Sequence, residues 1–454
     1  MYDLFVIGGG SGGVRGARWA AARGAKVALC EDDKMGGTCV VRGCIPKKLM
    51  SYAAHFPHDI ETMEAYGWEK FSPKFDWSKL RKNRDKEIER LSGIYLNILK
   101  NNKVDFFPGR GRVLESKDGI CTIQVGDQKI QAKNVLVATG GRATFPEGVE
   151  GVEHGITSNE IFHLPNFPKK LVVIGTGYIG LEFASIFHGL GSEVHVLCRK
   201  KYPLTGFDTD IQKFVYEQMQ ESGIHFHCET QVKVVEKVSE ENLTLKLSNG
   251  SELTNVSQVL FATGRSPNTV NLFEDQLGLE LNEWGAIEVD EYSKTNVPGI
   301  YAVGDVTDRM NLTPVALEEA MYVVENLFEG KSRAMTYENI ATAVFSSPEV
   351  ATCGLTEQEA IDRKIDFEVY QSNFRGLKYT LTELNTRTFM KMLVDKKSQK
   401  VIGLHMAGED SGEMMQGLAV ALKAGATKEQ LDLTIGIHPT AAEEWTTIRT
   451  PRNS

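Results

Sequence analysis

Two glycine-rich fingerprints constrain the fold of this chain more than any other feature. The first, DLFVIGGGSGGVRGARWAAARGAKVALCED, places Gly8, Gly10 and Gly13 at the GxGxxG spacing between an apolar strand and a small-residue helix. Glycines there permit a tight turn, and the helix N-terminus offers amide donors to a pyrophosphate. The following strand ends at Glu31, an acid that can bind ribose hydroxyls. We therefore predict a dinucleotide site at this end of the chain.

The second fingerprint, KLVVIGTGYIGLEFASIFHGLGSEVHVLCRKK, repeats this spacing. Its glycines are Gly175, Gly177 and Gly180. The position that corresponds to Glu31 holds Cys198. A basic run follows it, made of Arg199, Lys200 and Lys201. A carboxylate would repel a 2′-phosphate, whereas these cations attract one, so the second site is predicted to prefer NADPH to NADH. A solvated basic turn is the alternative interpretation.

The internal repeat extends beyond the fingerprints. NVLVATGGRATFP follows the first and QVLFATGRSPNTV follows the second, and each indicates an apolar strand, a glycine turn and a proline-bearing loop. Two nested dinucleotide folds are therefore expected. GIYAVGDV then predicts a buried strand ending at Asp305, whose carboxylate could hold the hydroxyls of a flavin or simply cap the next turn.

Two cysteines lie just beyond the first fingerprint, in GGTCVVRGCIPKK. Cys39 and Cys44 are separated by four residues. Disulfides are rare in a reducing compartment unless they turn over, so a close pair beside a dinucleotide site indicates a redox couple. A structural disulfide or two buried thiols are the alternatives.

Bulk composition narrows the class of protein. The formal net charge of −9 argues against general nucleic-acid binding, which needs a basic face. No basic-then-apolar leader precedes the first strand, and no apolar run approaches the length of a membrane span. The seven cysteines at 30, 39, 44, 121, 198, 228 and 353 include one close pair, which fits neither a disulfide framework nor a zinc ribbon. We expect a cytoplasmic protein without a metal site.

Other segments predict the remaining architecture. Residues 79–102 have apolar positions at helical spacing, which predicts a long amphipathic helix. From about residue 337, AVFSSPEVATCGLT and FMKMLVDKKSQKVIGLHMAG indicate strands, and EMMQGLAVALKAG indicates a helix. Thr356 and Glu359 have the spacing of a capping box at the start of a further helix.

The pieces in this order resemble the pyridine nucleotide-disulfide oxidoreductases, and within them the branch that reduces glutathione disulfide. Four motifs spread over the whole chain carry the resemblance: GGGSGG, GGTCVVRGCIPKK, GTGYIGLEFA and HPTAAEE. It implies an α/β fold with two nested, three-layer Rossmann-like domains and a C-terminal α+β dimerisation domain. The expected domains are 1–138 for FAD, 139–266 for NADPH, 267–336 completing the FAD site, and 337–454 at the dimer interface.

The resemblance also implies roles for individual residues. NADPH reduces FAD, FAD reduces the Cys39–Cys44 disulfide, and the dithiol reduces oxidised glutathione, which maintains thiol redox homeostasis. Cys39 is then the interchange thiol, and Cys44 faces the flavin as a thiolate. Lys47 matches the lysine near flavin N5, Glu182 its ion-pair partner, and Tyr178 the ring that covers the nicotinamide pocket.

A proton donor is needed for the departing glutathione thiolate. His438 precedes Glu443 in IGIHPTAAEEW, matching the family's His–Glu pair, and a carboxylate would fix the tautomer of the imidazole. In the family this pair reaches the cysteines of the other subunit. The resemblance therefore implies a homodimer with shared active sites.

The resemblance completes the expected cofactor contacts. Those of FAD are Gly8, Gly10, Ser11, Gly12, Gly13, Glu31, Gly37, Thr38, Lys47, Thr139, Gly140, Asp305 and Thr313. Those of NADPH are Gly175, Gly177, Tyr178, Ile179, Glu182, Arg199, Lys200, Lys201, Gly264 and Arg265.

The substrate contacts are less complete than those of the family. Arg18 and Tyr95 match family residues that contact glutathione, and Arg15 adds charge to the same helix face, with a solvent-facing role as its alternative. His438 and Glu443 would also contact the glutathione substrate. Three departures stand out: Met321 replaces a substrate arginine, Thr205 replaces a second 2′-phosphate arginine, and Arg42 is an extra charge between the cysteines.

Rival functions remain. A dihydrolipoamide dehydrogenase shares the cysteine loop but prefers NAD, which the basic run after Cys198 opposes. A reductase of a related low-molecular-weight disulfide would use the same machinery. A non-catalytic flavoprotein redox sensor is the alternative of another class, although it would need neither both cysteines nor the His–Glu pair.

Overall fold

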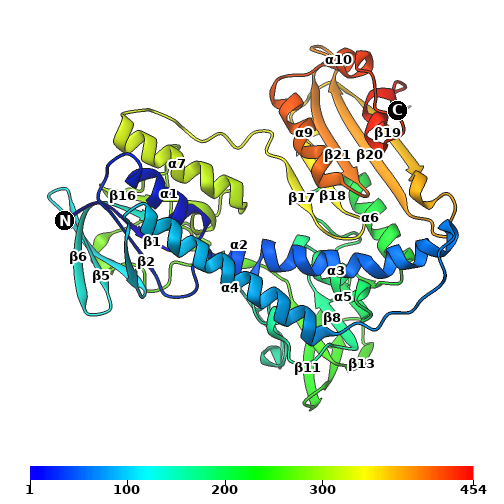
Figure 1. Ribbon diagram of the computed structural model, residues 1–454, viewed down its shortest axis with the longest axis horizontal. Coiled ribbons are helices and arrows are strands. Elements are labelled where there is room, and N and C mark those ends of the chain that lie inside the picture. Colours follow the sequence, from blue (N-terminus) through cyan, green and yellow to red (C-terminus); the bar gives the residue numbers. More distant parts are fainter. Residues whose placement is uncertain (453–454) are drawn as a thin grey trace.

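The computed structural model describes residues 1–452 and centres its N-terminal part on a seven-stranded sheet (Figure 1). The strand order is β3-β2-β1-β6-β5-β4, with β16 also pairing with β6. The strands are β1 (Tyr2–Ile7), β2 (Val27–Glu31), β3 (Asp105–Pro108), β4 (Gly111–Lys117), β5 (Ile120–Val125), β6 (Gln128–Val137) and β16 (Ile300–Ala302). β1, β2, β3, β6 and β16 pair in parallel, whereas β4, β5 and β6 form an antiparallel meander.

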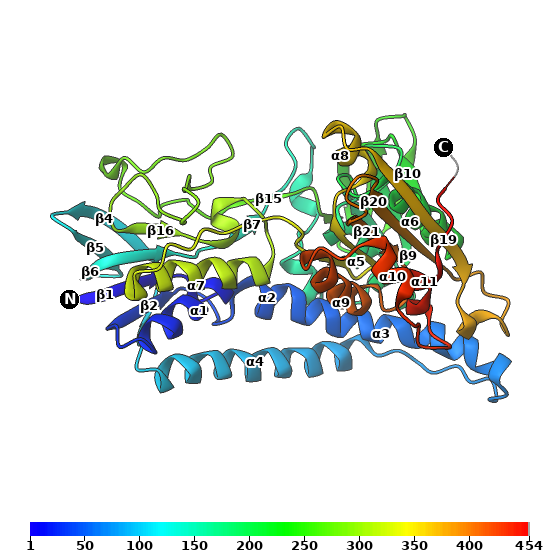
Figure 2. The same ribbon diagram turned by 90° about the horizontal axis from the view of Figure 1, so that it is seen from above.

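The strand before the first fingerprint is apolar from Leu4 to Ile7, because both of its faces are covered there. Leu4 and Val6 pack into one hydrophobic cluster with helices α1 (Ser11–Ala21) and α7 (Thr313–Glu329), whereas Phe5 packs into a second cluster on the other face. Helix α4 (Trp77–Asn101) lies outside α1, as Figure 2 shows from above. The predicted long helix is confirmed; Asp76 caps it by accepting a 3.0 Å hydrogen bond from Lys79 N.

A second sheet repeats the parallel arrangement with the order β10-β9-β8-β14. Its strands are β8 (Lys170–Ile174), β9 (Glu193–Cys198), β10 (His225–Cys228) and β14 (Gln258–Phe261). Helices α5 (Tyr178–Gly189) and α6 (Thr209–Glu221) accompany it, with a meander of β11 (Val232–Ser239), β12 (Asn242–Leu247) and β13 (Glu252–Val256). Strands β7 (Gly141–Ala143) and β15 (Arg265–Pro267) pair where the chain passes between the two repeats. The predicted internal repeat is therefore present.

Both fingerprints require glycine for the same steric reason. Gly8 has φ of +109°, and a Cβ on it would lie 2.4 Å from the carbonyl oxygen of Ala138, in the turn after β6. Gly175 has φ of +108°, and its Cβ would lie 2.3 Å from the oxygen of Ala262, in the turn after β14. The backbone of each fingerprint thus packs against the Ala-Thr-Gly turn of its own repeat, and a side chain on the glycine would prevent this packing.

The C-terminal part is an antiparallel five-stranded sheet with helices, as predicted. Its order is β17-β18-β21-β20-β19. The elements are β17 (Thr342–Val344), β18 (Val350–Gly354), β19 (Phe367–Arg375), β20 (Arg387–Asp395), β21 (Val401–Ala407), α8 (Glu357–Asp362), α9 (Ser411–Lys423), α10 (Lys428–Leu433) and α11 (Glu444–Thr447). The capping box of Thr356 and Glu359 is formed at the start of α8.

Helices α2 (Gly37–Arg42) and α3 (Cys44–Met63) connect the three parts through the middle of the molecule (Figure 1). Short 3₁₀ turns cover Glu64–Tyr66, Val152–His154, Glu160–His163, Asp275–Leu277, Gly304–Thr307, Leu377–Tyr379 and Ala441–Glu443. Among residues 1–452, no helix has the length and apolar character needed to cross a membrane.

Candidate active site

The two close cysteines lie on either side of a break between helices. Cys39 is within α2, and Cys44 is the first residue of α3. Gly43 forms the break, and a Cβ on it would lie 2.6 Å from the carbonyl oxygen of Thr38. Both cysteines are free thiols that shift each other's pKa, and Cys44 Sγ lies 3.8 Å from Thr313 Oγ1. The structure thus brings together the two sulfurs and a hydroxyl from α7.

The environment makes the two thiols unequal. The hydrogen bond from Cys39 lowers the pKa of Cys44 to about 6, and Thr313 and the positive charge of Lys47 act in the same direction. The position of Cys44 at a helix N-terminus also suits a thiolate. The same contact, together with burial, raises the pKa of Cys39. At neutral pH, the pair therefore holds one negative charge on Cys44 and one proton on Cys39.

A buried ion pair lies one helical turn beyond Cys44. Lys47 Nζ lies 2.5 Å from Glu182 Oε1, and both side chains are buried. Glu182 Oε1 also accepts a 3.0 Å hydrogen bond from Phe345 N, and Lys47 Nζ lies 4.4 Å from the Phe345 ring. The family resemblance implied the pairing of Lys47 with Glu182 but not the contact with Phe345, because a backbone donor leaves no mark in a sequence pattern.

One cavity of about 970 Å³ collects residues from distant segments around this pair. The predicted FAD contacts that line it are Gly8, Gly10, Ser11, Gly12, Glu31, Gly37, Thr38, Lys47, Thr139, Gly140, Asp305 and Thr313. Both cysteines and the first residues of α5, including Tyr178, Ile179 and Glu182, line it as well. The predicted contact Gly13 lies behind the lining, where a Cβ would come within 1.9 Å of Gly8 O.

The cavity fits a flavin dinucleotide. Glycine backbone and a helix N-terminus form one end, where a pyrophosphate can approach the amides of α1. At the end of β2, Glu31 Oε2 accepts a 2.6 Å hydrogen bond from Gly9 N, and burial raises the pKa of the Glu31 carboxyl. Cys44 and Lys47 lie along another part of the lining, within the same volume. The residues present therefore match both a dinucleotide and a redox-active ring.

Asp305 differs from the prediction in its local structure. The predicted strand to Asp305 is too long, because β16 ends at Ala302 and Gly304, with φ of +73°, turns the chain into a 3₁₀ helix. Asp305 still lines the cavity, and burial raises the pKa of its carboxyl. Arg265 lines the same cavity. Its Nη2 lies 3.9 Å from Asp305 Oδ2 and donates a 2.6 Å hydrogen bond to Gly141 O.

The basic run lies at the carboxyl end of β9, outside the lining of this cavity. Arg199, Lys200 and Lys201 are exposed. Cys198, directly before them, donates a 2.8 Å hydrogen bond to Lys200 O. The glycine turn of Gly175 and Gly177 precedes α5, and Leu204 N donates to Thr176 O at 2.9 Å, which holds the loop after the basic run against this turn. Gly264 occupies the corresponding turn after β14, with φ of +155°.

The predicted substrate residues come from two helices. Arg15 and Arg18 belong to α1, and Tyr95 belongs to α4. Burial raises the pKa of Tyr95, and the charge of Cys39 acts in the same direction. Burial lowers the pKa of Arg15, with Arg18 contributing, and Arg15 Nη1 lies 3.7 Å from Met321 Sδ. Arg42 forms an ion pair with Asp33 at the rim of the cavity.

The histidine and glutamate near the C-terminus lie apart from the cysteines. His438 Nδ1 is 3.0 Å from Glu443 Oε1, and the His438 side chain is 81% exposed. The neighbouring helix α10 lies apart from α2 in both ribbon views, and α11 does so in Figure 2. One copy of the chain therefore does not bring this pair to its own cysteines. Within residues 1–452, no group of His, Cys, Asp and Glu side chains is placed to hold a metal ion.

Comparison with known proteins adds a family match and close relatives. The Pyridine nucleotide-disulphide oxidoreductase family matches residues 2–320, and the dimerisation domain of that family matches residues 340–449. The chain is 46% identical to the chloroplastic/mitochondrial glutathione reductase of Pisum sativum, over 99% of this chain and 82% of the relative. It is 44% identical to a Nostoc sp. glutathione reductase and 42% identical to one from Burkholderia cepacia, over 99% of each chain.

Proposed function

The chain belongs to the pyridine nucleotide-disulphide oxidoreductase family, and on this premise we propose that it is a glutathione-disulfide reductase that uses FAD and NADPH. The observation that carries the proposal is the contact between Cys39 and Cys44, in which Cys44 has a pKa of about 6 and lies beside Lys47 in the dinucleotide cavity. Relatives that are 42–46% identical over nearly the whole chain are named glutathione reductases.

The residues of the cavity bind and orient the two cofactors. The glycine turn before α1 would hold the pyrophosphate of FAD, and Glu31 and Asp305, which line the cavity, would accept hydrogen bonds from its hydroxyls. When bound, FAD would supply the two-electron chemistry that links NADPH to the Cys39–Cys44 disulfide. Lys47, held by Glu182, places a positive charge where the reduced ring needs one. Tyr178, at the start of α5, shields the nicotinamide position from water.

The dithiol then acts on the substrate in two exchange steps. Cys39 attacks one sulfur of oxidised glutathione, forms a mixed disulfide and releases one glutathione thiolate. Cys44 attacks the sulfur of Cys39, which releases the second glutathione and restores the Cys39–Cys44 disulfide. The raised pKa of Cys39 means that its proton must be removed for the first attack and returned to a leaving thiolate. A histidine near neutrality suits both transfers.

That histidine comes from a second copy of the chain. His438 of the partner subunit, oriented by its hydrogen bond to Glu443, reaches Cys39 across a homodimer interface. The separation of α11 from α2 within one copy supports this arrangement (Figure 2). Leu433, Ile435 and Ile437 are 75–93% exposed beside His438, so this apolar segment is available for burial against the partner.

Charge supports the choice of substrate and of reduced cofactor. Arg15 and Arg18 offer two cations beside Tyr95 and Cys39, where the carboxylates of glutathione would lie. Arg199, Lys200 and Lys201 bind the 2′-phosphate of NADPH. We place the enzyme in the cytoplasm, where a reducing poise keeps such a dithiol in turnover; subcellular fractionation tests that location.

Steady-state oxidation of NADPH and NADH with a series of disulfides tests the function. Oxidised glutathione is expected to support far faster NADPH oxidation than lipoamide, cystine or trypanothione disulfide. NADH is expected to be the weaker donor. Faster turnover with lipoamide and the NAD couple would instead identify a dihydrolipoamide dehydrogenase, and no turnover with any disulfide would identify a non-catalytic flavoprotein.

A further inference from the structure

A second pair of cysteines lies at the carboxyl ends of two neighbouring strands of the NADPH domain. Cys198 ends β9 and Cys228 ends β10, and the two residues are direct partners in the parallel register. The pair is separate from Cys39 and Cys44, which lie in the helices between the domains. The sequence positions, thirty residues apart, gave no sign of it, because the pairing depends on the strand order.

The geometry suits a disulfide. Paired residues of adjacent strands lie about 4.8 Å apart, within the range of about 4.4–6.8 Å that a disulfide spans between Cα atoms. The two side chains point to the same face of the sheet, since residues in register in a parallel pair do so. The Cys228 thiol also interacts with Cys198, which contributes to the raised pKa of Cys228. Bond formation therefore needs no change of strand register.

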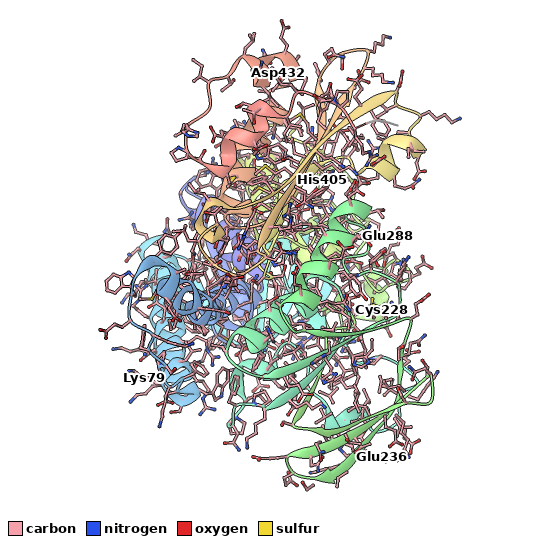
Figure 3. All side chains as sticks on the ribbon, turned by 90° about the vertical axis from the view of Figure 1, so that its right-hand side faces the viewer. Lys79, Cys228, Glu236, Glu288, His405 and Asp432 are labelled. Carbon is pink, nitrogen blue, oxygen red and sulfur yellow. The ribbon has the colours of Figure 1, made fainter. Side chains whose placement is uncertain are left out.

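The two thiols differ in access. Cys198 is fully buried, whereas Cys228 is partly exposed at the end of the edge strand β10. Figure 3 labels Cys228 in the green part of the chain, which forms the NADPH domain. A disulfide reagent can therefore reach Cys228 first, and Cys198 is then the neighbouring thiol that resolves the mixed disulfide.

Cys198 is also in contact with the cofactor-binding loops. Its Sγ donates to Lys200 O at 2.8 Å and lies 3.6 Å from Oγ1 of Thr176, the residue between Gly175 and Gly177. A single sulfur thus joins the basic run to the glycine turn. Oxidation removes its proton, so the hydrogen bond to Lys200 O is lost and the basic run is held less firmly.

The geometry points to Cys198 and Cys228 as a second redox-active pair that glutathione disulfide oxidises. Oxidation of this pair weakens NADPH binding. The choice of oxidant rests on the proposed function. Cys228 attacks oxidised glutathione, forms a mixed disulfide and releases one glutathione. Cys198 then attacks Cys228 Sγ and releases the second glutathione. Two thiols are oxidised to one disulfide, and one glutathione disulfide is reduced to two thiols.

The exchange is slow compared with turnover. Burial raises the pKa of Cys228 to about 12, with Cys198 contributing, so little thiolate is present at neutral pH. The pair therefore responds to prolonged exposure to oxidised glutathione when NADPH is depleted, and it responds faster as the pH rises.

Peptide mapping tests the inference on the whole enzyme. Reduced holoenzyme is incubated with oxidised glutathione without NADPH, the remaining thiols are alkylated, and linked peptides are identified by mass spectrometry. We expect a peptide link between residues 198 and 228, formed faster at pH 9 than at pH 7 and reversed by dithiothreitol. The KM for NADPH is expected to rise several-fold and that for NADH to change less, with ferricyanide as the electron acceptor.

Two variants make the result specific. Cys228→Ser should form no link and keep the KM of the reduced enzyme, whereas Cys353→Ser, which removes a buried thiol of the C-terminal sheet, should behave as wild type. Separate alkylation of residues 198 and 228 after incubation would overturn the inference, as would a link that leaves the NADPH KM unchanged. Ferricyanide accepts electrons without a disulfide substrate, so these outcomes do not depend on whether glutathione disulfide is the physiological substrate.

Discussion

Lys47 Nζ lies 2.5 Å from Glu182 Oε1, and this contact joins the helix that begins at Cys44 to the helix that follows the second glycine turn. Both side chains are buried, so neither charge has water as an alternative partner. The pair therefore couples helix α3 electrostatically to helix α5, at the place where residues of both helices line the cavity.

Glu182→Gln should slow the reduction of bound flavin by NADPH. The amide can still accept a hydrogen bond from Lys47 but leaves the ammonium without a counter-charge. Weakening this charge-assisted bond costs about 1–1.5 kcal/mol, which predicts a rate that is lower by roughly 5- to 10-fold. Stopped-flow absorbance of the flavin measures this rate. Lys48→Met, which breaks the partly exposed pair with Glu349, is the control and should leave the rate nearly unchanged.

The thiolate of Cys44 should persist in mildly acidic solution. The pKa of about 6 predicts that, in the reduced enzyme, alkylation of Cys44 by iodoacetamide falls off with a midpoint near pH 6. Thr313→Val removes a hydroxyl that stabilises the thiolate and should raise the midpoint by about half a unit to one unit. Thr313→Ser keeps the hydroxyl and should match wild type. A midpoint near that of a free thiol in the wild-type enzyme would contradict the proposed environment.

Arg199→Glu should reverse the preference for the phosphorylated cofactor. The new carboxylate repels the 2′-phosphate of NADPH and can bind the ribose hydroxyls of NADH. We expect the KM for NADPH to rise roughly 10- to 100-fold, as for the loss of a charged hydrogen bond, and the KM for NADH to change little or to fall. Lys213→Glu, an exposed change on α6 with the same net charge, controls for long-range effects. An equal rise in the KM for both cofactors would show that the basic run does not recognise the 2′-phosphate.

A histidine cluster predicts lower stability in acid. His195 Nδ1 lies 2.9 Å from His227 Nε2, His195 Nε2 lies 2.8 Å from Glu193 Oε1, and the rings of His195 and His225 stack at 4.8 Å. Burial lowers the pKa values of His195 and His227, and Lys170 acts in the same direction. As the pH falls, these histidines therefore bind protons in the unfolded chain before they do so in the folded chain. Their contribution to the free energy of unfolding is present above about pH 6.5 and is lost as the pH falls below it.

Chemical denaturation at a series of pH values measures this effect. The wild-type free energy of unfolding should fall between pH 7 and pH 5. His227→Gln removes one titrating ring and should make the curve flatter in that range. A curve of the same slope for the variant would show that the acid sensitivity arises elsewhere.

The sequence predicted those features that depend on local spacing. The glycine fingerprints, the long helix α4 and the capping box at Thr356 follow from steric and hydrogen-bonding rules that act within a few residues. The family resemblance supplied the pairing of Lys47 with Glu182, which the structure shows as a contact. No local rule joins two residues so far apart in the chain.

The remaining features depend on the three-dimensional arrangement. The hydrogen bond from Phe345 N to Glu182 comes from the backbone, which the side-chain pattern does not encode. The contact between Cys198 and Cys228 requires the strand order of the second sheet. The end of β16 at Ala302 depends on the positive φ of Gly304, which the apolar pattern of the segment concealed.

Rapid reduction of glutathione disulfide by NADPH, compared between wild type and Cys39→Ser, tests the central claim most directly. The serine variant should still accept electrons from NADPH, because Cys44 and Lys47 remain in place, but its turnover with glutathione disulfide should fall to background. Cys353→Ser should retain full turnover. Undiminished reduction of glutathione disulfide by Cys39→Ser would contradict electron transfer through the Cys39–Cys44 pair.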